Sequence, residues 1–134
     1  MLAALACATL FAAASAERVT VRGAIEIADH DGANEGWPAI YLVADSGERL
    51  ELISDEPDTL HTWSDPELKD RTWELEGFRL DGDRFEVRKM FTIKDGKRYQ
   101  VTYYCEICHI TSYRPGPCMC CQEKVELREI AVDE

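Results

Sequence analysis

The stretch TWELEGFRLDGDRFEVRKMFTIKDGKRYQVTYY, residues 72–104, decides the fold class. It divides into three segments of strand-forming residues, 72–80, 84–93 and 97–104, and an Asp-Gly pair lies at each break. Asp-Gly between alternating apolar residues is a strong short-range signal for a β-hairpin. The stretch therefore predicts consecutive antiparallel strands, with a bulge at Gly77, where the alternation is interrupted.

The residues before this stretch continue the β pattern. Residues 18–28 alternate apolar and polar side chains, as a half-buried strand does. Residues 39–53 predict two strands joined by a turn at residues 45–47. The sequence SDPE at residues 64–67 is typical of a helix start, with a serine cap and proline in the first turn. It predicts one short helix over about 65–71.

Roughly seven short strands and one short helix predict a mainly β protein. A sheet of this kind avoids exposed edges by closing on itself. We therefore expect a small OB-like β-barrel, of the oligonucleotide/oligosaccharide-binding type, with about five strands and the helix before the fourth. The strands 97–104 and about 124–130 would form a C-terminal cysteine-rich hairpin that extends from it.

Residues 1–16, MLAALACATLFAAASA, are uncharged and end in a small-x-small sequence. This pattern predicts a signal peptide cleaved after Ala16, and hence a periplasmic or secreted protein. Lipidation at Cys7 is the alternative, but the apolar run continues for nine residues past that cysteine. The run is shorter than the ~20 apolar residues of a transmembrane helix, so we expect no transmembrane segment. The expected division is a signal peptide at 1–16, a β-barrel domain at 17–104, and the cysteine-rich hairpin with the final strand at 105–134.

The charge of the chain limits its partners. The formal net charge is −11 at pH 7. Nucleic-acid backbones and anionic membrane surfaces bind proteins through Lys and Arg, so neither is an expected partner. The sequence also has no Gly-x-Ser-x-Gly, no phosphate-binding loop and no paired-carboxylate signature. We therefore propose no catalytic residue, and expect a protein or small-molecule ligand as partner.

Five of the six cysteines lie within 17 residues near the C-terminus. Such a local, odd-numbered cluster is typical of a metal or redox site rather than of a disulfide framework. Cys105 and Cys108 form one C-x-x-C pair, and Cys118 and Cys121 form a second. Together they offer four thiolates at tetrahedral geometry, which suits Zn²⁺. Cys120 is an alternate fourth ligand, because a C-x-C spacing also reaches one ion.

Other chemistry stays open for the same cysteines. Residues 105–109, CEICH, match the c-type haem attachment pattern, in which His109 would ligate the iron and Met119 or Met90 would be the sixth ligand. Cys120 and Met119 are soft ligands that also suit Cu(I). The C-x-x-C pairs are also compatible with a redox dithiol or with inert disulfides. The strand-rich surroundings and the three further cysteines disfavour haem.

The stretch FEVRKMFTIKDGKRYQVTYYCEICHITSYRPGPCMCCQEKVELRE, residues 85–129, resembles an uncharacterised family of small exported bacterial proteins. Members of this family share a DGK-x-Y turn, a tyrosine pair before C-x-x-C, and a PG-x-C-x-C-C segment before an acidic strand. The resemblance covers about a third of the chain. It implies that the five cysteines act as one unit and that His109 is outside the shared pattern.

Overall fold

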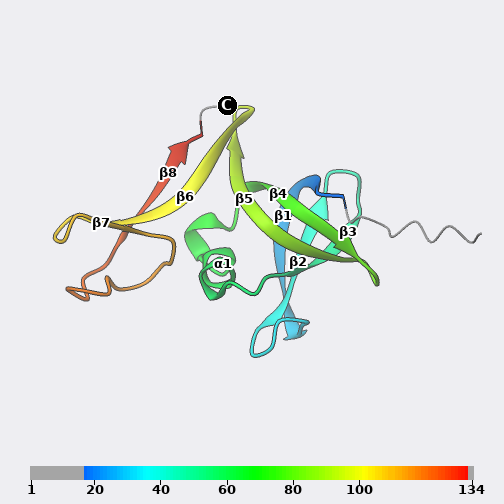
Figure 1. The fold of residues 1–134 in the computed structure, drawn as a ribbon, viewed down its shortest axis with the longest axis horizontal. Helices are drawn as coiled ribbons and strands as arrows, with labels where there is room; N and C mark the ends of the chain where they lie inside the picture. Colours follow the sequence, from blue (N-terminus) through cyan, green and yellow to red (C-terminus); the bar gives the residue numbers. More distant parts are fainter. Residues whose placement is uncertain (1–16, 133–134) are drawn as a thin grey trace, which may run out of the picture.

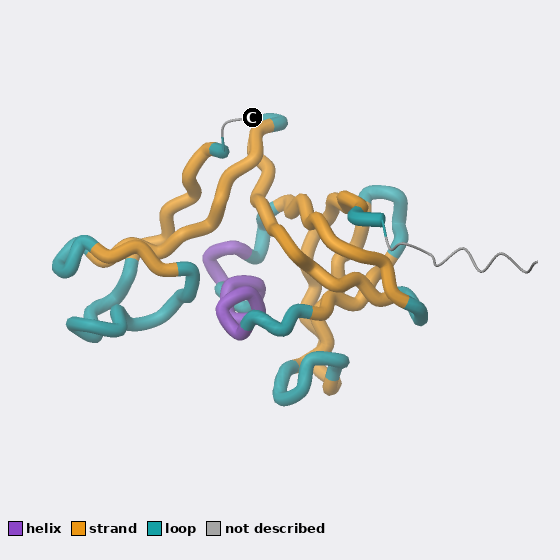
Figure 2. Tube along the Cα trace, viewed as in Figure 1, coloured by secondary structure: helices purple, strands orange, loops and turns teal. Residues whose placement is uncertain are grey.

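The computed structural model describes residues 17–132, so the expected signal peptide lies outside the described residues. The strands are β1 (Val19–Asp31), β2 (Pro38–Ala44), β3 (Arg49–Ile53), β4 (Thr72–Leu80), β5 (Arg84–Lys94), β6 (Lys97–Cys105), β7 (Ile110–Ser112) and β8 (Glu126–Ala131). The helix α1 (Pro57–Trp63) and the 3₁₀ turn η1 (Pro66–Leu68) lie between β3 and β4. The predicted class, mainly β with one short helix and a terminal cysteine-rich hairpin, is confirmed (Figure 2).

The first five strands form a closed ring (Figure 1). β1 pairs antiparallel with β2 and β4, β2 with β3, and β4 with β5. A parallel pairing between β3 and β5 completes the ring. Each of the five strands thus has a neighbour on both sides within the ring, as expected of a sheet that reduces exposed edges by closing, and the end of β5 also pairs with β6.

Alternating apolar side chains fill the interior of the ring, as the sequence pattern predicts. Seven of them are at most 1% exposed: Ile40, Leu42, Leu50, Leu52, Trp73, Leu75 and Phe85. The register of β4 against β5 shifts beside Gly77, but the extra residue of the bulge is Arg88 of β5, because Glu76 pairs with Lys89 and Gly77 pairs with Val87. A Cβ at Gly77 would lie 1.9 Å from the carbonyl oxygen of Glu86, so only glycine allows this close approach.

The helical segment differs from the prediction. The α-helix is α1, which ends before the predicted range of about 65–71, and that range holds only the 3₁₀ turn η1. Asp65, not Ser64, caps this turn, with its carboxylate accepting the Glu67 N–H at 3.0 Å. The turn stays short because Leu68 is buried and β4 begins four residues later. Within residues 17–132, no helix is long and apolar enough to cross a membrane.

The helix α1 begins with a proline in its first turn and buries Leu60 and Trp63 in the core. At seven residues it is too short to be stable by propensity alone, so this burial is what fixes it. In Figure 1, α1 lies in the angle between the ring and the C-terminal strands.

β6 and β8 extend away from the ring as an antiparallel arm, with β7 beside the end of β6 (Figure 1). The predicted hairpin is therefore present, and the three-residue β7 is an addition. Three side chains of β6, at Val101, Tyr103 and Cys105, belong to the same buried cluster as Leu60 and Trp63 of α1. The arm consequently shares one apolar core with the ring and the helix.

Candidate metal centre

The first C-x-x-C pair lies on a tight turn between β6 and β7. Cys105 pairs with Ile110 across this turn. The backbone N–H of His109 donates to the carbonyl oxygen of Cys105 at 2.8 Å. His109 has a φ of 57°, a left-handed conformation that few non-glycine residues adopt. The turn therefore directs Cys105 and Cys108 to the same side.

The second C-x-x-C pair lies on a turn of the same design. The N–H of Cys118 donates to the carbonyl oxygen of Glu123 at 2.8 Å, next to a bridge between Pro117 and Lys124. The N–H of Gln122 donates to the carbonyl oxygen of Cys118 at 2.9 Å, and Gln122 has a φ of 62°. In both turns, the residue after the second cysteine has a left-handed backbone, and its N–H donates to the carbonyl oxygen of the first cysteine.

The two turns bring four sulfur atoms together. The Sγ atoms of Cys105, Cys108, Cys118 and Cys121, here called the quartet, all lie within 4.8 Å of one another. The Sγ atoms of Cys105 and Cys121 are 3.5 Å apart. Four sulfurs that each lie ~2.3 Å from a central zinc ion, at tetrahedral corners, are about 3.8 Å from one another. The dimensions of the quartet therefore fit one tetrahedral ion.

The quartet is made of the four cysteines that the spacing predicts. Cys120, the predicted alternate ligand, is outside it and exposed to solvent, next to Met119, which is 93% exposed. Within the quartet, Cys105 and Cys118 are buried, whereas Cys108 and Cys121 are half-buried. The N–H of Cys108 points to the Cys105 sulfur at 3.4 Å, as expected of a metal-binding turn.

The residues predicted to complete a haem site are not brought together. His109 is exposed, and its Nδ1 lies 2.7 Å from the hydroxyl of Tyr104. Met90 is in β5 and packs against the core, whereas Met119 is in the exposed turn. Cys118 and Cys121 lie beside the two thiols that would carry the haem. The arrangement thus favours an ion held by four thiolates.

The thiols of the quartet differ in acidity. The backbone N–H groups of Cys121 and Cys120 lower the pKa of Cys118 to about 6. Hydrogen bonding with Cys121, burial, and the sulfurs of Cys118 and Cys105 raise the pKa of Cys108 to about 12. Clustered thiols oppose each other's ionisation, and a divalent cation at the centre reverses this, because its charge favours every thiolate.

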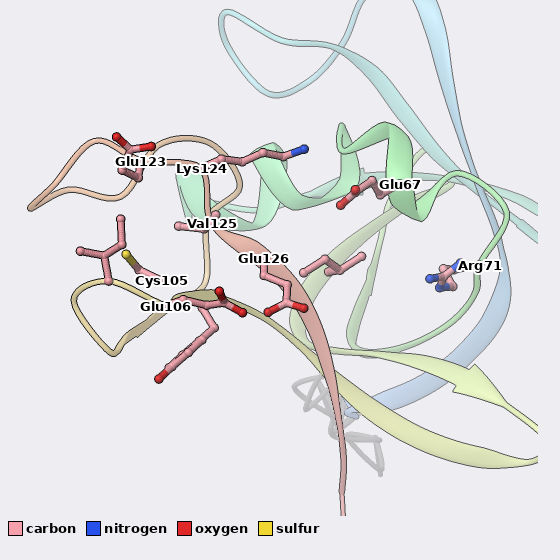
Figure 3. Close-up of a pocket in the computed structure, with 11 residues that line it drawn as sticks. Glu67, Arg71, Cys105, Glu106, Glu123, Lys124, Val125 and Glu126 are labelled. Atoms are coloured by element: carbon pink, nitrogen blue, oxygen red, sulfur yellow. The ribbon is translucent and has the colours of Figure 1, made fainter.

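Two clefts flank the quartet. The first, here called the thiol cleft, has a volume of about 800 Å³ and lies between α1 and residues 110–125. The second, here called the acidic cleft, has a volume of about 750 Å³ and is shown in Figure 3. Its charged lining residues are Glu67, Glu106, Glu123, Glu126, Arg71 and Lys124. Cys105 and Val125 line both clefts and separate them.

The helix α1 holds the cysteine loop in place through contacts that the sequence did not indicate. Arg114 Nη2 lies 2.7 Å from Nε2 of His61, and the Thr62 hydroxyl lies 3.0 Å from the carbonyl oxygen of Tyr113. The ring of Trp37 packs edge-on against His61. The partners are 51 and 53 residues apart, so no local pattern could have identified them.

Comparison of the chain with protein-family models, with curated proteins and with solved structures gives no match. The family resemblance inferred from the sequence therefore stays a prediction. The functional interpretation depends on the geometry of the quartet and its surroundings.

Proposed function

We propose that this chain is an exported binding or structural module in which the quartet binds one Zn²⁺ ion. The ion would fix the loops at the end of the arm against α1. The single observation that carries this proposal is that two turns of matching backbone design place four sulfurs within 4.8 Å of one another.

Zinc is the ion best suited to this donor set. A tetrahedral site of four thiolates is typical of structural zinc, since Zn²⁺ has no geometric preference of its own and binds sulfur strongly. The N–H of Cys108 directed at the Cys105 sulfur supports the same interpretation, because backbone donors orient and stabilise metal-bound thiolates. Zinc in such a site supplies folding energy rather than catalysis.

The ring supports a binding role for the rest of the molecule. Five strands closed by a parallel β3–β5 pairing, with a helix between β3 and β4, agree with the expected OB-like barrel. Proteins of that fold bind ligands on strand faces and loops, and this step is an analogy of fold. The net charge of −11 favours a protein or small-molecule ligand over nucleic acid.

The first test is elemental analysis with an absorbance spectrum, on protein exported to a bacterial periplasm. We expect one zinc ion per chain and no haem band. Covalent haem would contradict the proposal and indicate an electron carrier. If neither zinc nor haem is found, counting free thiols will show whether the cysteines form disulfides.

A pair of variants tests the ligand set. Cys118→Ser removes one of the four thiolates and should reduce zinc content to well below one ion per chain. Cys120→Ser is the matched control, because it makes the same change two residues away at an exposed thiol outside the quartet. Full zinc content in Cys118→Ser would show that the ligand set is wrong.

A further inference from the structure

The thiol cleft places a fifth sulfur beside the quartet. Cys105 and Cys118 of the quartet line this cleft, and so do Cys120 and Met119. Because Cys120 and Met119 are exposed, soft donor atoms extend from the solvent-facing rim of the cleft to two of the proposed ligands. Cys108 and Cys121 do not line the cleft.

The opposite side of the quartet is less suited to an approaching metal complex. Four carboxylates and two cations line the acidic cleft, and Figure 3 shows the carboxylates of Glu106, Glu123 and Glu126 around Cys105. A metal ion carried by thiolate or carboxylate ligands is anionic at its surface, so this side repels it. The thiol cleft instead has Arg114, His61 and one carboxylate, that of Asp58, among its lining residues.

We propose that Cys120 is a relay ligand, through which the quartet receives Zn²⁺ from low-molecular-weight thiol complexes and releases it to them. This inference rests on the proposed function. Soft thiolate donors bind Zn²⁺, and a tethered thiol beside the site acts as an intramolecular nucleophile.

The relay is a sequence of ligand exchanges. The Cys120 sulfur forms a bond to the ion as one carrier–zinc bond breaks, and its proton passes to the released carrier thiolate. Cys118 and then Cys105 exchange in the same way, since both line the cleft. Cys108 replaces the last carrier ligand, and Cys121 then replaces Cys120, whose thiolate takes up the proton that the Cys121 thiol gives up. Every bond formed replaces one that is broken, and zinc keeps its oxidation state.

The test is the rate at which the protein takes up and releases zinc. Zinc-loaded wild type and Cys120→Ser are mixed with an excess of a chromogenic chelator, and the apoproteins are mixed with a zinc–glutathione complex. We expect both proteins to hold one zinc ion at equilibrium. We expect Cys120→Ser to transfer zinc more slowly in both directions, by roughly tenfold or more, because the tethered thiol is lost.

Ile107→Ser is the matched control. Ile107 is the third residue of the first C-x-x-C turn, as Cys120 is of the second, and it is 64% exposed but does not line the thiol cleft. Its transfer rate should equal that of wild type. Equal rates for Cys120→Ser and wild type would overturn the relay, and so would loss of zinc from Cys120→Ser, which would make Cys120 a permanent ligand. A wild type that binds no zinc would instead contradict the proposed function itself.

Discussion

Tyr103 connects the arm to the helical segment through its hydroxyl group. This side chain is 2% exposed, and its hydroxyl donates to Oδ2 of Asp65 at 2.6 Å. Burial, followed by the Asp65 carboxylate, raises the pKa of Tyr103 well above its ordinary value of 10.0. The phenol therefore stays protonated in the folded protein at a pH where it ionises in the unfolded chain.

We predict that Tyr103→Phe lowers the free energy of unfolding at pH 7 by about 1.5–3 kcal/mol, because a hydrogen bond to a charged acceptor is lost. The difference should change with pH. Since the folded pKa is raised, the stabilisation is complete below pH 10.0 and decreases as the pH rises further, by about 1.4 kcal/mol per unit. Denaturant unfolding of both proteins from pH 7 to pH 11 measures it.

Tyr104→Phe is the control for this prediction. The Tyr104 hydroxyl lies 2.7 Å from His109 Nδ1 at the surface, so its loss should cost less than about 1 kcal/mol. If the difference between wild type and Tyr103→Phe stays constant above pH 10.0, the hydroxyl is not the group that titrates.

The candidate site could be predicted from the sequence in part, because the spacing of nearby cysteines determines part of its geometry. Two C-x-x-C spacings are enough to predict that each pair of thiols faces one side. They do not determine whether Cys120 or Cys121 faces the other pair. That choice depends on the left-handed backbone at Gln122, and on the path of residues 113–117 across α1, where Arg114 contacts His61.

At the scale of elements, Glu129 of β8 holds the arm against the rest of the protein. Its Oε1 accepts a hydrogen bond from Arg71 Nε at 2.8 Å and forms an ion pair with Arg71 Nη2 at 2.7 Å, and its Oε2 accepts a hydrogen bond from the Thr92 hydroxyl at 2.7 Å. Burial opposes ionisation, but the hydrogen bonds from Arg71 and Thr92 outweigh it and lower the pKa of Glu129. One carboxylate thus joins β8 to β5 and to the loop before β4.

Replacing Glu129 by Gln should lower the free energy of unfolding by about 1.5–3 kcal/mol at neutral pH, since a charged acceptor with two partners is lost. Because the folded pKa is lowered, this stabilisation is present above pH 4.5 and disappears as the pH falls below that value. Thermal or denaturant unfolding of wild type and Glu129→Gln at pH 7 and at pH 3 measures the difference in stability under each condition.

Glu126→Gln supplies the comparison on the same strand. The carboxylate of Glu126 is paired with Arg128 at an exposed position, so the change should cost less than about 1 kcal/mol. An equal effect of both substitutions would mean that Glu129 contributes no more than a surface ion pair.

The strands were predicted more accurately than the helix, for a physical reason. Alternation and Asp-Gly turns are local, and β4 has the predicted bounds, 72–80. The helix α1 depends on the burial of Leu60 and Trp63 and on the contact between Thr62 and Tyr113, all of which arise only after the chain has folded. The three-residue β7 likewise depends on the turn formed by the first C-x-x-C pair.

The whole molecule combines a ring that is closed by its own pairing with an arm whose end carries the quartet. We predict that a chelator that removes the proposed zinc ion will increase hydrogen exchange strongly in residues 105–125 and only slightly in β1 to β5. The free energy of unfolding should decrease by about 4 kcal/mol relative to protein in zinc at a thousandfold excess over Kd. Hydrogen exchange with mass spectrometry measures the change in protection, and denaturant unfolding measures the change in the free energy of unfolding.

The same measurement on Cys120→Ser should give the wild-type result, because this thiol is outside the quartet. Uniform loss of protection over the ring and the arm would show that the metal stabilises the whole fold. Unchanged protection in residues 105–125 would show that the loops are held by their packing on α1 alone.

The closed ring and the arm also differ in their tendency to aggregate. Ring strands have neighbours on both sides, whereas within residues 17–132 β8 pairs only with β6, which leaves its outer edge available to strands of other molecules. Glu126 and Arg128 are charged side chains along this short strand, and charge is a common protection against edge-to-edge association. The most hydrophobic position there is Ile130, which is 51% exposed, so the self-association of this protein should begin at the C-terminal end of β8.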